Sequence, residues 1–289
     1  MKDSESLQND TPKEFVLVRL LGVLGSVALT RGQSFFSRLG GASLLLGRSA
    51  SLTVKGVFVP SARIKGQTLA IQMVRLGVKA IPIVILIQMA IGMIMPLQMF
   101  PKLDEFGQAD QVATINAIAA FRELGPLMTA IVLSGFAGAS IAAELGTMVT
   151  SEEIEALEVM ALNPVRFLVL PRLLATIMMT VMLSVIADVV MIGSGMLTGM
   201  GLGLDSDTYY QMTLDAVDLT GFATGLVKAG IYGLLIGLIS CFLGLSVKPW
   251  EGSEGVGNAT TKTVVYSIVA VIIAAAIFTM IFYSYGLFD

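Results

Sequence analysis

Histidine is absent from this chain of 289 residues, and cysteine occurs only once, at Cys241 inside an apolar run. A zinc site, a disulfide framework and a Cys/His catalytic dyad are therefore excluded within the chain. The phosphate-binding pattern G-x-x-x-x-G-K-[ST] is missing, as are G-x-S-x-G and H-E-x-x-H. We therefore expect no metal, no cofactor and no enzymatic activity, and any ATP must be hydrolysed on another protein.

Charge is also scarce. Only 13% of the residues are charged, the net charge is -3, and the basic residues are scattered rather than gathered in a stripe, which argues against a nucleic-acid partner. In contrast, 55% of the residues are hydrophobic and the mean hydropathy is +0.83. The apolar residues form blocks of about 20 or more, the length that an α-helix needs to cross a hydrocarbon layer ~30 Å thick.

The pattern predicts an all-α integral membrane protein with about five transmembrane helices. We place a polar lead and an N-terminal interfacial helix (residues 15–29) in residues 1–65, and the membrane domain in residues 66–289. The predicted spans cover about residues 76–100, 112–144, 167–204, 222–247 and 264–287. The third block would extend ~57 Å as a helix. We favour one long, partly broken helix over a chain that folds back near Asp188 or at the later glycines.

The distribution of lysine and arginine predicts a cytoplasmic N-terminus. With that orientation, all basic residues except Lys102, Arg122 and Lys228 fall in the inner segments 1–79, 144–172 and 247–263. Segment 30–79 carries many of them and is expected beside anionic headgroups, with an ordinary solvated linker as the alternative. The loop at 201–221 has four aspartates and no positive charge, as an external loop can have.

The polar stretch between the second and third spans predicts a short cytoplasmic helix at about residues 150–162. Thr150 and Glu153 match a capping box, and Asn163-Pro164 is expected to end the helix. Such an acidic, amphipathic helix could receive force from a partner; the alternative is a helical loop that lies on the membrane. The candidate coupling residues are Glu144, Glu152, Glu153, Glu155, Leu157 and Glu158.

Two charges, Arg122 and Glu123, fall inside the second predicted span. Isolated charges there are unfavourable by at least about 3 kcal/mol, so they should pair or face a polar cavity. Pro126 follows and should distort the helix. If the span begins later, both charges lie instead at the external interface. The candidate substrate-pathway residues are Gln98, Arg122, Glu123 and Pro126, with Asp188 and Lys228 as weaker candidates.

Small residues recur at a spacing that permits close helix contact, for example Gly233 with Gly237 and Gly135 with Ala139. Ordinary packing within the chain explains such pairs, and a dimer seam is the alternative.

Several motifs in order strongly resemble the MlaE/YrbE permease family over about residues 66–285. They are Arg-Glu-Leu-Gly-Pro at 122–126, Ala-Ala-Glu-Leu-Gly-Thr-Met at 142–148, Glu-Glu-Ile-Glu-Ala-Leu-Glu-Val-Met at 152–160, Asn-Pro-Val-Arg at 163–166, Pro-Arg at 171–172 and Glu-Gly-Val-Gly-Asn-Ala-Thr-Thr-Lys-Thr-Val-Val at 254–265. The chain departs from the pattern at Phe136, where many members have arginine, and near Ala275, where relatives often have an acidic residue.

The resemblance implies a multi-pass permease of the bacterial inner membrane that forms a homodimer and is driven by a cytoplasmic ABC ATPase. It further implies a periplasmic ring of MCE-domain proteins, sometimes a small STAS-domain partner, and a lipid substrate, most often a phospholipid. By the same likeness, residues 144–160 couple to the ATPase, and Arg122 and Glu123 lie near the lipid cavity. Two alternatives from other classes remain: an ion- or proton-coupled secondary transporter that uses Asp188, Lys228 and Glu123, and a membrane anchor that transports nothing.

Overall fold

The structure, a computed structural model, describes residues 66–286. Within this range every regular element is helical. The five stretches long and apolar enough to cross a membrane are Gly66–Glu105, Gln111–Thr150, Val165–Gly201, Leu219–Leu245 and Pro249–Ser284. They confirm the predicted all-α class and the number of spans. The predicted interfacial helix at 15–29 and the segment 30–65 lie outside the described residues.

The first stretch contains α2 (Gly66–Leu76), the short turn η2 (Val78–Ala80) and α3 (Ile81–Glu105). Pro82 lies in the first turn of α3, where a missing N–H costs no hydrogen bond. The helix continues past Pro96, which the sequence placed near the end of the span. The helical stretch therefore begins earlier and ends later than the predicted span at 76–100.

The second stretch alternates between α-helix and π-helix. It comprises α4 (Gln111–Ala119), the π-helical turn η3 (Ala120–Leu124), α5 (Gly125–Leu133), a second π-helical turn η4 (Ser134–Gly138) and α6 (Ala139–Thr150). The predicted distortion at Pro126 therefore takes the form of a π-helical turn immediately before it. Such turns often mark functional positions in helices.

The third stretch is one continuous helix. A π-helical turn η5 (Val165–Val169) leads into α8 (Leu170–Gly201), which is ~48 Å long and passes through Asp188 without a break. The prediction of one long helix is therefore confirmed, whereas the partial break expected within it and the fold-back alternative at Asp188 are wrong. α8 packs along α3 and also contacts α2 and α5.

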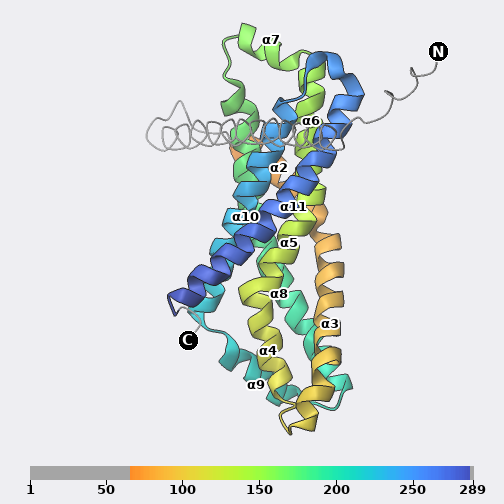
Figure 1. Ribbon diagram of the computed structural model, residues 1–289, viewed down its shortest axis with the longest axis vertical. Helices are drawn as coiled ribbons and strands as arrows, with labels where there is room; N and C mark the ends of the chain where they lie inside the picture. Colours follow the sequence, from red (N-terminus) through yellow and green to blue (C-terminus); the bar gives the residue numbers. More distant parts are fainter. Residues whose placement is uncertain (1–65, 287–289) are drawn as a thin grey trace, which may run out of the picture. The chain divides into compact units, whose positions relative to one another are not determined.

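The remaining helices complete the bundle. α9 (Ser206–Ala216) lies in the predicted external loop and is followed by α10 (Leu219–Leu245), the short turn η6 (Pro249–Glu251) and α11 (Gly252–Ser284). Figure 1 shows α9 near one end of the bundle and α7 (Glu153–Val159) at the opposite end. α11 begins at Gly252, twelve residues before the predicted fifth span, because hydropathy marks only the apolar part of a longer helix.

One hydrogen bond caps α9, and another ties it to the bundle. The Asp205 carboxylate accepts the backbone N–H of Thr208 at 3.0 Å and caps the helix, and bonds to Thr208 hold the pKa of Asp205 below its usual range. The Asn116 amide donates to the Tyr209 hydroxyl at 3.2 Å, which ties α9 to α4.

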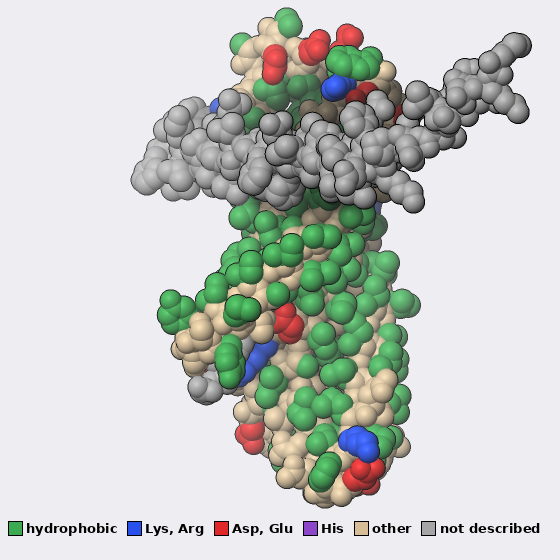
Figure 2. Space-filling view, in the orientation of Figure 1, with side chains coloured by type: hydrophobic (Ala, Val, Ile, Leu, Met, Phe, Trp, Pro, Cys, Tyr) green, Lys and Arg blue, Asp and Glu red, His purple; other side chains and the backbone are tan. Residues whose placement is uncertain are grey.

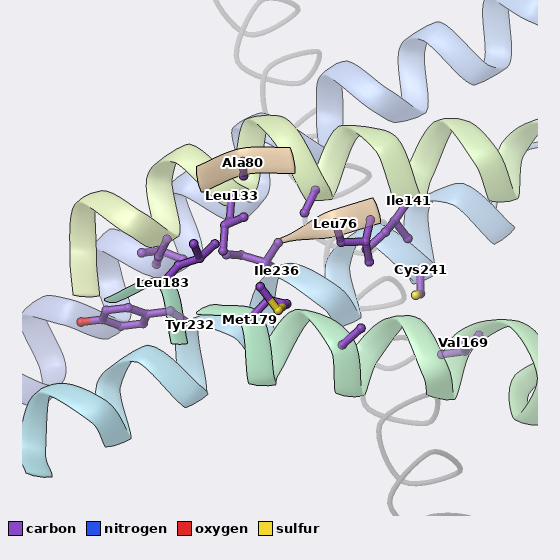
Figure 3. Close-up of a cluster of buried hydrophobic side chains, with 14 of the residues drawn as sticks. Leu76, Ala80, Leu133, Ile141, Val169, Met179, Leu183, Tyr232, Ile236 and Cys241 are labelled. Carbon is purple, nitrogen blue, oxygen red and sulfur yellow. The ribbon is translucent and has the colours of Figure 1, made fainter. Parts of the chain in front are cut away.

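The core of the bundle lies where α8 and α10 cross. A Cβ at Gly233 would approach Ile177 Cα to 2.8 Å, and one at Gly237 would approach Leu173 Cδ1 to 2.9 Å. This glycine pair therefore supports packing within the chain. Figure 3 shows side chains of the buried cluster from α8 and α10 meeting those from the second stretch, among them Leu183, Ile236 and Leu133. Close van der Waals packing of this kind drives helix association in lipid.

Candidate functional site

Pro126 creates the polar centre of the second stretch. Because proline has no N–H, the carbonyl of Arg122, four residues earlier, loses its α-helical donor. The buried Lys228 of α10 supplies a replacement, with its Nζ 3.1 Å from Arg122 O. Close helix contact makes this possible: a Cβ at Gly225 would overlap the carbonyl oxygen of Phe121. Lysine and glycine on α10 thus compensate for the irregular backbone of η3.

The Lys228 ammonium is also the centre of a network of side chains. Its Nζ lies 2.5 Å from Glu123 Oε2 and 3.0 Å from Thr279 Oγ1, and Thr279 donates to the same carboxylate oxygen at 2.9 Å. Lys228 is fully buried, whereas the Glu123 side chain is 31% exposed. The ion pair satisfies both charges within the apolar part of the bundle and joins η3, α10 and α11.

Arg122 points toward the start of α10 instead. A Cβ at Gly221 would lie 3.0 Å from Arg122 Nε. Backbone hydrogen bonding at Thr220 lowers the pKa of Asp218, the N-cap of α10, and the Arg122 charge adds a smaller decrease. The two charges predicted together are therefore both engaged, but with different partners.

An open groove of about 480 Å³ runs beside this network, between the second stretch and α11. Its walls are mostly apolar, and its polar groups come from the network; the lining residues are Ile118, Ala119, Arg122, Glu123, Ala275, Ala276 and Thr279. Figure 2 shows an acidic and a basic group close together in the middle of the mostly apolar surface, apart from the charged groups at its two ends. The groove combines an apolar surface with charged side chains in its lining, which suits an amphiphilic molecule.

A second groove of about 400 Å³ is lined by residues of α10 and by Phe282 of α11. The Phe282 ring also lies 5.6 Å from Lys228 Nζ, a cation–π distance. Residues of both grooves therefore contact Lys228, which the sequence ranked as a weaker candidate.

The other pathway candidates lie elsewhere. Gln98 is exposed on α3 and lines neither groove, and Pro126 is buried behind η3. The buried amide of α3 is Gln88, whose Nε2 lies 3.4 Å from Leu124 O and 3.5 Å from Gly125 O. Sequence reasoning missed Gln88 and Thr279. The only sequence signal for these two residues is that each is a polar side chain within an otherwise apolar helical run.

The candidate coupling helix is α7, and it begins differently from the prediction. Thr150 belongs to α6, where its hydroxyl donates to Thr147 O at 3.0 Å, and Glu152 precedes α7 in a left-handed conformation with φ 61°. The predicted capping box is therefore wrong, because α6 continues through Thr150. Glu153 instead accepts a hydrogen bond from Ser151 Oγ at 3.1 Å.

The end of α7 also differs. The helix stops at Val159, and the Asn163 side chain accepts from the backbone N–H of Val165 at 3.0 Å. Asn163 therefore starts the next helix rather than ending this one. Val159 is 88% exposed and Met160 60% exposed beside the acidic residues. The exposed acidic candidates are Glu152, Glu153, Glu155 and Glu158, while Leu157 is half-buried.

Glu144 differs from the other coupling candidates because arginines of the same chain bind it. Its Oε1 lies 2.7 Å from Arg75 Nη1 of α2 and 2.9 Å from Arg172 Nη2 of α8. The Arg172 side chain is only 5% exposed and also donates to Leu168 O at 2.7 Å. Glu144 therefore joins α6, which leads into α7, to two other helices.

Comparisons with known proteins identify the family of this chain. The model of the family described as "Permease MlaE" matches residues 69–281. The chain is 31% identical over 273 residues to the "Intermembrane phospholipid transport system permease protein MlaE" of Haemophilus influenzae, covering 94% of this chain and all of the relative.

Two further relatives come from different organisms. A "Probable ABC transporter permease protein" of Rickettsia bellii is 33% identical over 214 residues, 74% of this chain and 82% of the relative. The chloroplastic protein TRIGALACTOSYLDIACYLGLYCEROL 1 of Arabidopsis thaliana is 30% identical over 214 residues, 74% of this chain and 61% of the relative. With its five apolar helices and a family match over most of its length, the chain belongs to the MlaE permease family.

Proposed function

We propose that this chain is the permease subunit of an ATP-driven transporter that moves phospholipid between the inner membrane and a periplasmic MCE-domain carrier. The observation that carries the proposal is the open, mostly apolar groove lined in part by Glu123 and Thr279, which bind the buried Lys228. Acyl chains would lie along the alanine and isoleucine walls, and the headgroup would face the polar atoms.

The fixed charges suit a headgroup that carries both signs. Arg122 at the groove offers donors to a phosphate, and the partly exposed Glu123 carboxylate offers acceptors to an ammonium group. The printed name of the Haemophilus relative includes phospholipid transport, which supports this substrate class.

The energy for transport would come from ATP hydrolysis by a cytoplasmic ABC ATPase that binds α7. Support comes from the exposed glutamates and the exposed Val159 and Met160 on that helix, from the missing phosphate-binding loop, and from relatives named as ABC transporter permeases. With α7 inside, the N-terminus is cytoplasmic. The functional unit would be a homodimer with two ATPases, an MCE ring and, where present, a STAS-domain protein.

The proposal is tested by transfer of a fluorescent phospholipid from proteoliposomes that contain the assembled complex. We expect transfer with ATP and none with a non-hydrolysable analogue. Thr279→Val should slow transfer several-fold while the complex still assembles, because it removes a hydroxyl from the groove. Thr261→Val is the matched control, since Thr261 is an exposed threonine of the same helix that lies outside the groove.

Two results would overturn parts of the proposal. Transfer without nucleotide would favour the ion- or proton-coupled alternative. Equal transfer by the Thr279 and Thr261 variants would show that the groove is not part of the lipid path. Unaltered transfer in every groove variant would favour a membrane anchor that transports nothing itself.

A further inference from the structure

Asp188 is a buried acid that the proposed lipid path does not use. It lies in the middle of α8, ~20 Å along the axis from Gly201, and is only 2% exposed. Its Oδ1 has no hydrogen-bond partner among the described residues. An ionised carboxylate in such a place would need a counter-charge.

The nearest helices do not provide one. Among residues 66–286 no ion pair involves Asp188; Lys228 of α10 binds Glu123, and Arg75 of α2 binds Glu144. Arg172 of α8 itself also binds Glu144. Helices α4 and α5 carry no titratable side chain. The other titratable or charged groups on elements packed against α8 are Lys102, Asp104, Glu105, Arg122, Glu123, Arg166, Asp207, Tyr209, Tyr210, Asp215, Tyr232 and Cys241.

Three spans meet around Gly125, where Asp188 lies. A Cβ at Gly125 would overlap Asp188 Oδ1, so the carboxyl group packs directly against this glycine. Gln88 of α3 reaches the same residue, with its Nε2 3.5 Å from Gly125 O. Thr129 is one helical turn after Gly125 and therefore lies on the same face of α5.

The oxygen atoms at this junction outnumber the donors that could bind them. Gln88 Oε1 and Thr129 Oγ1 are buried, and neither has a hydrogen-bond partner among the described residues. The amide oxygen and an ionised carboxylate can only accept, and the single Thr129 hydroxyl can donate to just one of them, whereas a protonated carboxyl group donates one hydrogen bond more. A proton on Asp188 would therefore supply the second donor that the two acceptor-only oxygens need. A bound Ca²⁺ fits less well, because it takes about six to eight oxygen ligands and three are unpartnered here.

We propose that Asp188 is a proton-binding site, occupied in the folded chain, at the junction of α3, α5 and α8. Water that enters when these spans separate would let the proton leave. Proton release and uptake would then accompany any rearrangement of these three helices, whatever the transported molecule.

Infrared spectroscopy of the full chain in lipid nanodiscs tests the site directly. At about pH 7, where exposed carboxyl groups are ionised, we expect a carbonyl stretch of a protonated carboxylic acid. Asp188→Asn, which preserves size, should abolish this band, and Glu123→Gln should leave it. Absence of the band from the wild type, or its persistence in Asp188→Asn, would overturn the assignment.

Thermal unfolding against pH gives a second, independent test. Because unfolding exposes Asp188 and releases its proton, the midpoint of the wild type should fall as pH rises from about 5 to about 8. Asp188→Asn should show a flatter profile. If both profiles have the same slope, or if Na⁺ or Ca²⁺ raises the midpoint of the wild type alone, the site does not bind a proton.

Discussion

Glutamate has opposite surroundings in two regions of this molecule. Glu123, among the spans, shares a buried ammonium and a threonine hydroxyl with two other helices. The glutamates of α7 are exposed at one end of the bundle. Within the spans, a charged side chain must find its partners in the chain itself, and those partners reveal its role. A charged side chain on α7, at the end of the bundle, remains accessible to another protein. Mutations should therefore change stability in the first region and assembly in the second.

The largest loss of stability is expected for Lys228→Met. It leaves the Glu123 carboxylate without its counter-charge and removes the Lys228 donor from the Arg122 carbonyl, and we expect a loss of about 2 to 4 kcal/mol, since Glu123 is partly exposed. Denaturant unfolding in detergent measures this. The double variant with Glu123→Gln should recover part of the loss; if the two losses simply add, the pair is not coupled.

Gly225→Ala should have the next largest effect. Its methyl group would collide with the Phe121 carbonyl oxygen, so α10 must move away from η3, at about 1 to 3 kcal/mol. Gly135→Ala is the matched control, because a Cβ there meets open space. Equal stability of the two variants in the same unfolding assay would contradict the proposed close contact of α10 and η3.

The two arginines that bind Glu144 should differ from each other. Arg172→Gln removes a buried partner and should cost about 2 kcal/mol, whereas Arg75→Gln removes one that is 46% exposed and should cost less than about 1 kcal/mol. Thermal unfolding midpoints of the two variants give the order. A larger fall in the midpoint for Arg75→Gln than for Arg172→Gln would mean that α2, rather than α8, is the main anchor of α6.

Charge reversal on α7 should leave stability almost unchanged. Lysine at Glu152, Glu155 and Glu158 alters only exposed positions, but it should abolish co-purification with the ATPase. Asp215→Lys, an exposed acid on α9 at the other end, should retain the ATPase. Normal binding by the triple variant would contradict the role proposed for α7.

The sequence predicted elements better than it predicted contacts. Blocks of hydropathy gave five spans and one long third helix, because both depend on local composition. The pairing of Glu123 with Lys228 joins residues 105 positions apart and depends on how α10 packs, which no local pattern contains. The predicted capping box failed for a local reason: Thr150 is the last residue of α6, and its hydroxyl bonds back to Thr147 O instead of capping α7.

The most direct test of the lipid path is photo-crosslinking of a radiolabelled phospholipid in the assembled complex. A photoreactive side chain at Ala276 would lie in the groove, and one at Val265 would lie on the exposed surface of the same helix. The proposed path predicts that ATP hydrolysis changes the adduct yield at position 276 and leaves that at position 265 constant. Equal behaviour at both positions would contradict it, because the groove would then be no more than surface facing bulk lipid.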